Sequence, residues 1–320
     1  MSPLPSQASP LIGLPFSDPT QGMPMPDGWQ EKPIRYEERL AGYDLVLTLD
    51  QQVYQILTPI IEQFAAENHI KVAIRKGTCG ISGGMLDNKR VDMAGFCCAP
   101  GQIDRFPGLR FHTLGIGAIA IFTHPSNPIR DISLTDLRAI YQGERYRWSE
   151  VNKSAGKNSH DLPIRTVGRL HCKLRPGHWR LLLNNGDLFS PRMLEVGTIA
   201  DMILQVASFP EAIGYETIWH VDRYRQQGKV QPLTIDAISH QDTQALAQGR
   251  YPLYRTFNIT TWEGNLANPH ADRLVTHLLK MVENLAPHYG LVPASHLRKT
   301  GWQFMGNELI GKPVSANPSP

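Results

Sequence analysis

Strand-like and helix-like patterns alternate along most of this chain, and that alternation limits the fold more than any other sequence feature. Short apolar runs predict a series of strands, at 44–50, 71–75, 91–96, 163–168 and 212–216. A longer apolar segment over 109–122 predicts a strand that crosses between two lobes, and a strand at 253–261 is expected to return. Strands that alternate with helices are typical of α/β architecture with mainly parallel sheets. We therefore predict an α/β fold.

Helical spacing of apolar residues fills the intervals between these strands. Ser133 is the expected N-cap of the second long helix. The predicted helices lie at 53–64, near 85–89, at 134–141, at 193–206 and at 268–285, and Pro176 suits the first position of one more.

Proline distribution and the two crossing strands give the expected domain organisation. Residues 1–40 hold many prolines without an apolar period, so they predict an N-terminal arm, extended or laid over the body. One lobe is expected from 41–123 plus 256–305, a second from 124–255, and a C-terminal tail from 306–320.

Composition excludes some classes of protein. The 320 residues are 41% hydrophobic and 19% charged, which is ordinary for a globular protein, and the net charge of +3 does not indicate nucleic-acid binding. No run of eighteen apolar residues predicts a transmembrane helix. The start at Met1 lacks the pattern of a secretory signal, which fits either a cytoplasmic protein or one whose signal was removed.

Three segments that can carry chemistry follow predicted strands, and ligands in α/β sheets bind beyond the carboxyl ends of strands. The first, Gly77–Gly84, is glycine-rich, so its backbone can approach a ligand closely, and it contains Cys79 at an expected helix start. The second contains the adjacent Cys97 and Cys98. The third, 169–180, is the densest cationic stretch of the chain.

Each segment also has a plainer interpretation. The four cysteines, completed by Cys172, show no CxxC or zinc-ribbon spacing, and could be structural disulfides or buried thiols. The cationic stretch could be a solvated face, or Trp179 could stack on a base, although one such segment is weak evidence. The Gly115-Ile-Gly117 run imitates a dinucleotide fingerprint, but it lies inside a predicted strand.

An ordered set of short motifs resembles the phosphate-binding receptors of ABC importers. The set runs through the glycine-rich loop, the strand at 91–97, Asn127-Pro128, Leu134–Gly143, Trp148, a loop beginning at Arg169, and Ala212–Tyr215. This resemblance covers roughly residues 44 to 290. It implies a two-lobed periplasmic-binding-protein-like fold with a ligand cleft between the lobes, and a periplasmic location.

The departures from that family bear on the ligand. The family's phosphate-accepting aspartate falls on Cys97, and Cys79 lies beside the position of its anion-binding serine. The Ser-Gly-Thr donors of its third loop are replaced by His171, Cys172 and Lys173, although Arg169 is kept. The resemblance thus implies a ligand site made of Thr78, Cys79, Gly80, Cys97, Arg169, His171, Cys172 and Lys173.

We therefore expect a receptor for a thiophilic metal, a metalloid or a small oxyanion, because thiolates prefer soft ligands such as Cu or Zn. The predicted metal ligands are Cys79, Cys97, Cys172, His171 and His178. Two alternatives remain: a permanently bound Cys/His metal or redox centre, and a phosphate-like oxyanion binder with a structural disulfide. An enzyme using a Cys172–His178 or Cys97–His171 pair ranks last, because no carboxylate orients either pair. The expected partner is a membrane transporter or sensor, and the chain is expected to be a monomer that binds no nucleic acid.

Overall fold

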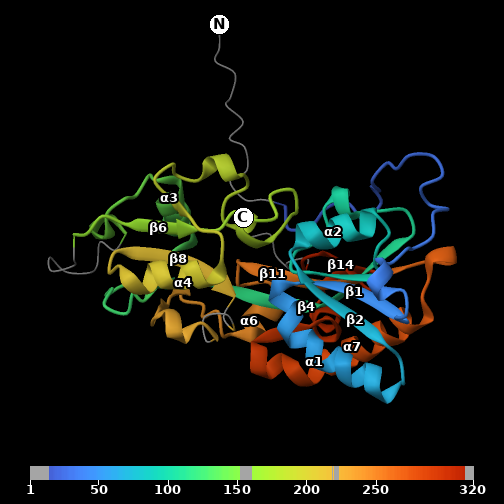
Figure 1. Cartoon of the computed structure of the whole chain (residues 1–320). Helices are drawn as coiled ribbons and strands as arrows, with labels where there is room; N and C mark the ends of the chain where they lie inside the picture. The colour runs from blue at the N-terminus through green and yellow to red at the C-terminus, as the bar shows by residue number, and fades with distance from the viewer. Residues whose placement is uncertain (1–13, 152–160, 218, 220–222, 314–320) are drawn as a thin grey trace, which may run out of the picture. The chain divides into compact units, whose positions relative to one another are not determined.

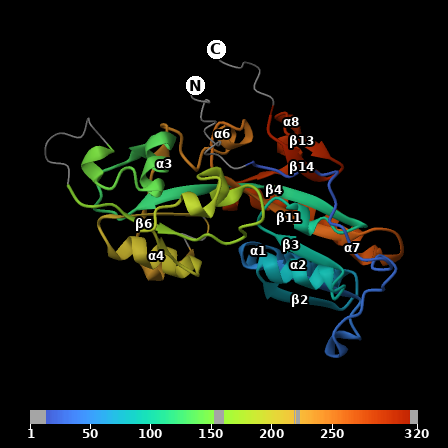
Figure 2. The ribbon, with the colours of Figure 1, turned by 90° about the horizontal axis from the view of Figure 1, so that it is seen from above.

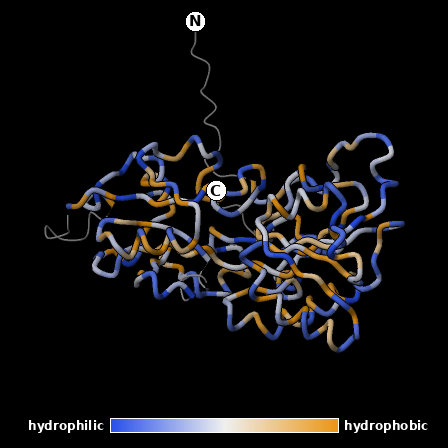
Figure 3. Tube along the Cα trace, viewed as in Figure 1, coloured by the Kyte–Doolittle hydropathy of each residue, from blue (hydrophilic) through white to orange (hydrophobic). Residues whose placement is uncertain are grey.

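The computed structural model describes residues 14–151, 161–217, 219 and 223–313, and these form two compact units. Unit 1 comprises Leu14 and Pro15 with the described parts of 119–173 and 177–240. Unit 2 comprises 16–118, 174–176 and the described part of 241–320. Hydrophobic stretches of the chain run through the interior of each unit (Figure 3). None of the described helices combines the length and hydrophobicity needed to cross a membrane.

The sheet of unit 2 begins with three parallel strands and continues with antiparallel ones. Its order is β2-β1-β3-β11-β4, and β12 also pairs with β4. β1 is parallel to both β2 and β3, whereas β11 is antiparallel to β3 and β4. The strands are β1 (Leu45–Asp50), β2 (Val72–Gly77), β3 (Met93–Phe96), β4 (Leu109–Thr123), β11 (Tyr254–Trp262) and β12 (Leu291–Pro293).

Helices cover both faces of this sheet, with α2 on one side and α1 and α7 on the other (Figure 1). Asp50 caps α1 by accepting a hydrogen bond from the Gln52 backbone amide, and Asn268 caps α7 in the same way through the His270 amide. The helices of unit 2 are α1 (Gln51–Glu67), α2 (Cys79–Asp87), α6 (Thr243–Ala247), α7 (Pro269–Tyr289) and α8 (Ala294–Lys299).

Unit 1 has a smaller sheet, which its own helices cover. The last residues of β4 pair with β8, and β8 continues to β6 and β7. Ile199, Met202, Ile203 and Val206 of α4 pack against Phe122 and Val167. The elements of unit 1 are β5 (Asp131–Ile132), β6 (Arg165–Gly168), β7 (Leu194–Glu195), β8 (Ala212–Thr217), β9 (Gln231–Pro232), β10 (Thr234–Ile235), α3 (Leu134–Gln142) and α4 (Ile199–Ser208).

The proline-rich arm packs on unit 2 from residue 16 onward. Trp29 is buried and stacks on Phe106, with their ring centroids 5.6 Å apart. The Lys89 ammonium lies 4.2 Å from the Trp29 ring centroid and donates hydrogen bonds to the carbonyls of Gln30 and Lys32. Figure 2 shows the arm, in blue, running along this unit.

At the C-terminal end, β13 (Gln303–Met305) and β14 (Glu308–Gly311) form a hairpin, and its second strand lies in the stretch 306–320 where the sequence suggested a tail. Short 3-10 helices complete the described structure: η1 (Glu38–Leu40), η2 (Gln102–Asp104), η3 (Trp148–Glu150), η4 (His178–Leu181), η5 (Gly186–Leu188), η6 (Arg225–Gln227) and η7 (Gly264–Leu266).

The predicted α/β fold is confirmed, with corrections at several helix starts. The helix expected near 85–89 begins earlier, at Cys79, because the Thr78 hydroxyl caps the glycine-rich run itself. The helix expected at 193–206 begins only at Ile199, where Thr198 supplies the cap. Pro176 does not open an α-helix; a single 3-10 turn follows from His178, after Gly177 in a positive-φ conformation.

Candidate functional site

The glycine-rich run places Cys79 at the start of α2. The Thr78 hydroxyl accepts a hydrogen bond from the Ile81 amide, so the helix begins directly after β2. Cys79 is fully buried, because it lies on the same side of α2 as the buried residues Ser82 and Leu86. The expectation of a cysteine at a helix start behind a strand is therefore confirmed.

Cys79, Cys97 and Cys98 form a compact group of thiols in unit 2, which we call the thiol cluster. The Sγ atoms of Cys79 and Cys97 are 3.5 Å apart, and those of Cys97 and Cys98 are 3.8 Å apart. All three Sγ atoms lie within 4.8 Å of one another, and all three residues are buried. Each cysteine is a thiol rather than half of a disulfide. β1, β2 and β3 are parallel, so their carboxyl ends share one edge, and the cluster lies there.

A buried carboxylate adjoins the thiol cluster. Asp50 ends β1, and its Oδ2 accepts a hydrogen bond from the Cys79 thiol at 3.5 Å while its Oδ1 accepts one from the Gln52 amide at 2.8 Å. Burial raises the pKa of Asp50 well above its usual value, and the negative charge of Cys97 raises it further. The site therefore gathers groups that become ligands of a cation when they lose protons.

A buried guanidinium also adjoins Cys97. Arg255 is the second residue of β11, is completely buried, and directs Nη1 toward Cys97 Sγ at 3.9 Å. Its positive charge partly offsets the rise in the pKa of Asp50. Farther along β11, the Asn258 side chain donates a hydrogen bond of 2.8 Å to the Cys98 carbonyl and holds the turn after β3.

Sequence reasoning did not find Asp50, Cys98 or Arg255 as site residues. Asp50 could have been found from the sequence, because it is an acidic residue at the end of an apolar run. Cys79 and Cys97 also follow the ends of such runs. Arg255 is an arginine inside an apolar strand, which also marks a buried charge that needs a partner. Cys98 was set aside as a disulfide partner or core thiol.

Arg175 of the cationic stretch belongs to unit 2 and supports the thiol cluster from outside. Its Nε donates to Asp104 Oδ2 at 2.9 Å, and its Nη2 donates to the Cys79 carbonyl at 3.2 Å. The ion pair is buried on both sides. Arg175 therefore fixes the beginning of α2, and this part of the cationic stretch is not a solvated face.

The other predicted residues of the cationic stretch lie in unit 1. Arg169 is buried, and its Nη2 is ion-paired with Glu216 Oε2 at 3.0 Å. The His171 and His178 rings stack with centroids 5.7 Å apart. Lys173 is exposed, whereas Cys172 is half-buried with a positive φ of 57°. That Cys172 joins the thiol cluster remains a prediction.

Trp179 does not suit base stacking. It is buried in unit 1, its ring packs edge-on against Phe189 with centroids 5.6 Å apart, and its Nε1 donates to the His171 carbonyl. A base-stacking residue needs an exposed ring face, so the alternative of nucleic-acid binding through this residue is wrong.

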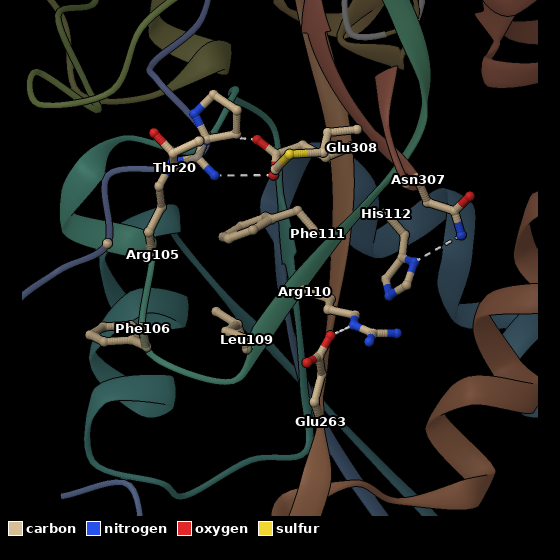
Figure 4. Close-up of a pocket in the computed structure, with 14 residues that line it drawn as sticks. Thr20, Arg105, Phe106, Leu109, Arg110, Phe111, His112, Glu263, Asn307 and Glu308 are labelled. Carbon is tan, nitrogen blue, oxygen red and sulfur yellow. Dashed lines mark hydrogen bonds and ion pairs between the residues drawn. The ribbon is translucent and has the colours of Figure 1, made fainter.

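A separate hollow of about 620 Å³ lies on unit 2 between the arm, β4 and the C-terminal hairpin. Figure 4 shows that its charged residues pair with one another: Arg105 with Glu308, and Arg110 with Glu263. His112 is held between Asn307 and Thr261. The hollow therefore directs no uncompensated charge at a ligand, and the thiol cluster is the better candidate site.

Comparison with known proteins agrees with this architecture. The model of the PBP superfamily domain matches residues 37–276. No curated protein matches the sequence significantly. Solved structures that match the fold include an ABC-type phosphate transport receptor from Vibrio cholerae, which is 18% identical with a TM-score of 0.60, covering 78% of this chain and 99% of that one.

Two further solved structures have a similar fold. A putative phosphate ABC transporter substrate-binding protein from Clostridium perfringens, solved with bound phosphate, is 18% identical with a TM-score of 0.63, over 78% of this chain and 98% of that one. A possible phosphate binding protein from Planctomyces limnophilus is 16% identical with a TM-score of 0.52, over 80% and 95%. At such identities the likeness establishes the fold, and the ligand must be argued from the site.

Proposed function

This chain belongs to the PBP superfamily, and we propose that it is a solute receptor for a thiophilic metal ion or metalloid, bound by Cys79, Cys97 and Cys98. The observation that carries the proposal is the thiol cluster: three buried sulfur atoms within 4.8 Å of one another at the carboxyl edge of parallel strands. Clustered thiolates bind Cu(I), Zn(II) and related soft ions in preference to hard ones.

The side chains at the carboxyl edge of the sheet, where the thiol cluster lies, favour a cation over an oxyanion as the ligand. Three thiols and the Asp50 carboxyl group become negative when they lose protons, and Arg255 is the guanidinium that contacts them. An oxyanion needs several strong N–H or O–H donors directed at it, and a thiol is a weak donor. A cation, in contrast, would be stabilised by every one of these groups except Arg255.

The alternative is a phosphate-like oxyanion, for which the Clostridium perfringens protein gives the precedent. Thr78, Gly80, Arg169, His171 and Lys173 would be its ligands, as the resemblance implies. Within unit 1, however, Arg169 is already ion-paired with Glu216, so that its charge is compensated before any ligand arrives. We therefore place the oxyanion second.

Beyond the thiol cluster, Cys172, His171 and His178 are the other candidates for a metal donor. Cys172 precedes Arg175 by three residues, and Arg175 is fixed in unit 2 by Asp104 and by the Cys79 carbonyl. Three extended residues span at most about 10 Å, so the backbone of Cys172 stays within that reach of Arg175.

Receptors of this kind deliver their ligand to a membrane partner, and we propose a periplasmic location and a transporter or sensor as that partner. A permanently bound metal centre is the competing role. The two roles differ in how the metal is released. A receptor releases its metal on dialysis against a chelator and stays folded, whereas a protein with a structural metal centre unfolds when the metal is removed.

Calorimetric titration of reduced, anaerobically purified protein tests the function directly. We expect one equivalent of Zn(II), Cu(I) or arsenite to bind and inorganic phosphate to give no heat. Cys97→Ser should weaken the binding of the metal at least about 100-fold, since a thiolate ligand is lost. Binding of phosphate without metal would overturn the proposal in favour of the oxyanion receptor.

A further inference from the structure

We propose that Asp50 is the fourth ligand of the metal, so that Cys79, Cys97, Cys98 and Asp50 form a complete Cys3Asp site for a divalent ion such as Zn(II) within unit 2. The inference rests on the proposed function and makes it more specific. It assigns a ligand that the sequence motifs did not indicate, and it selects among the soft ions that three thiols alone would admit.

Three of the distances between these groups match the edges of a tetrahedral site. With Zn–S near 2.3 Å and Zn–O near 2.1 Å, a regular tetrahedron has S–S edges of about 3.8 Å and S–O edges of about 3.6 Å. The structure has 3.5 Å between Cys79 Sγ and Cys97 Sγ, 3.8 Å between Cys97 Sγ and Cys98 Sγ, and 3.5 Å between Cys79 Sγ and Asp50 Oδ2. Along these three edges the groups already have the spacing that the ion requires.

The Asp50 carboxylate is oriented for this role. Its Oδ1 is occupied by the Gln52 amide at the start of α1, which leaves Oδ2 turned toward the thiols. Capping alone does not require a buried acidic residue, because Thr78, Ser133 and Asn268 cap other helices of this chain with neutral side chains, and the one other aspartate that caps a described α-helix, Asp242, is exposed. An aspartate that is 2% exposed carries a desolvation cost, and a bound cation would offset it.

Arg255 balances the charge of such a site. Three thiolates, one carboxylate and a divalent ion sum to minus two, and the Arg255 guanidinium beside Cys97 reduces this to minus one. A donor that contacts a ligand sulfur also fixes its orientation. Arg255 is therefore proposed as a positioning residue that does not touch the metal.

The candidate ions differ in their affinity for an oxygen ligand. Zn(II) accepts carboxylate oxygen together with sulfur, whereas Cu(I) favours sulfur alone. Trivalent arsenic is satisfied by three thiolates in a pyramid. Removal of the Asp50 carboxylate should accordingly weaken Zn(II) and leave arsenite binding intact.

The test uses Asp50→Asn, which keeps the shape of the side chain and its capping oxygen, since asparagine caps helices as well as aspartate does. The matched control is Asp242→Asn, because Asp242 also caps a helix of unit 2, by accepting from the Ala245 amide at 2.8 Å, but is exposed. Zn(II) affinity is measured by competition with a chromophoric chelator, and arsenite affinity by calorimetry. We expect Zn(II) to bind about 10- to 100-fold more weakly to Asp50→Asn, with arsenite within about twofold and the control unchanged.

A measurement on the unaltered protein makes the test independent of the variant's folding. X-ray absorption of the Zn(II)-loaded protein should give three sulfur atoms near about 2.3 Å and one oxygen near about 2.0 Å. Four sulfur atoms would overturn the inference and place Cys172 in the fourth position. Unchanged Zn(II) affinity in Asp50→Asn, or an equal loss for Zn(II) and arsenite, would also overturn it. Failure of the proposed function looks different, because wild-type protein would then bind neither ion.

Discussion

Arg105 and Glu308, which are 203 positions apart in the chain, form a bidentate ion pair that is buried on both sides. Arg105 Nη2 lies 2.7 Å from Glu308 Oε1, and Nη1 lies 3.1 Å from Oε2 (Figure 4). The same guanidinium donates to the Ser17 hydroxyl of the arm at 3.0 Å. One side chain therefore joins the N-terminal arm, the loop before β4 and the C-terminal hairpin.

Arg105→Met should destabilise the protein by about 3–5 kcal/mol, because it leaves the Glu308 carboxylate buried without its partner. The double variant Arg105→Met/Glu308→Leu removes both charges and should recover at least about half of that loss. Urea unfolding followed by circular dichroism gives both values. If the double variant is less stable than Arg105→Met alone, the ion pair is not the source of the effect.

His112 should make the stability of the protein depend on pH between about 4 and 6.5. Burial lowers the pKa of His112 to about 4, from an unfolded value near 6.5. Asn307 donates to Nδ1, so Nε2 carries the proton and donates to Thr261 Oγ1 at 2.8 Å, and the ring is neutral. The unfolded chain then binds more protons in this range, and the free energy of unfolding falls as the pH falls, by at most about 3 kcal/mol.

Urea unfolding at pH 7 and pH 5 measures this dependence. His112→Gln should lose stability at pH 7 but show a smaller difference between the two pH values than the wild type. His296→Gln, at an exposed position, is the control and should keep the wild-type difference. An unaltered pH difference in His112→Gln would refute the assignment.

Gly115→Ala should destabilise unit 2 by about 1–3 kcal/mol, the range of an overpacked site. A Cβ at this position would lie 2.5 Å from the Val292 carbonyl oxygen of β12, which is backbone and cannot rotate away. Gly84→Ala is the matched control in an exposed part of α2 with no atom within 4 Å, and it should be neutral or stabilising by up to about 1 kcal/mol. Thermal unfolding of the two variants separates them; similar melting temperatures would contradict the packing argument.

Alkylation should distinguish Cys172 from the thiol cluster. Cys172 is half-buried, whereas Cys79, Cys97 and Cys98 are at most 1% exposed. Iodoacetamide followed by peptide mass spectrometry should therefore label Cys172 first in the reduced native protein, and all four cysteines only in urea. Early labelling of Cys97 or Cys98 would show that the cluster opens in the native state.

The sequence predicted those parts of the fold and site that depend on local pattern. The strand ends before Cys79 and Cys97 follow from short apolar runs, and the Ser133 cap was confirmed because a cap is set within one helical turn. The resemblance to phosphate-binding receptors implied that Cys79 and Cys97 share a site, and the parallel strands do bring them to one edge of the sheet.

The partners contributed by distant segments could not be predicted in this way. Arg255 reaches Cys97 only because β11 pairs with β3. The sequence pattern near residue 97 does not predict this pairing. The ion pair of Arg169 with Glu216 on β8 likewise joins segments that no local pattern connects. In each case tertiary pairing, and not local propensity, decides what the charged group contacts.

The return of β11 also has a consequence for the order in which the site is made. Arg255 is synthesised 158 residues after Cys97, so at about 5–20 residues per second the thiols precede their guanidinium by about 8–30 s. During that interval β11 has not been synthesised, so β3 lacks its antiparallel neighbour. The nascent chain therefore presents three neighbouring thiols to the ions and oxidants of its surroundings before the finished protein can select among them.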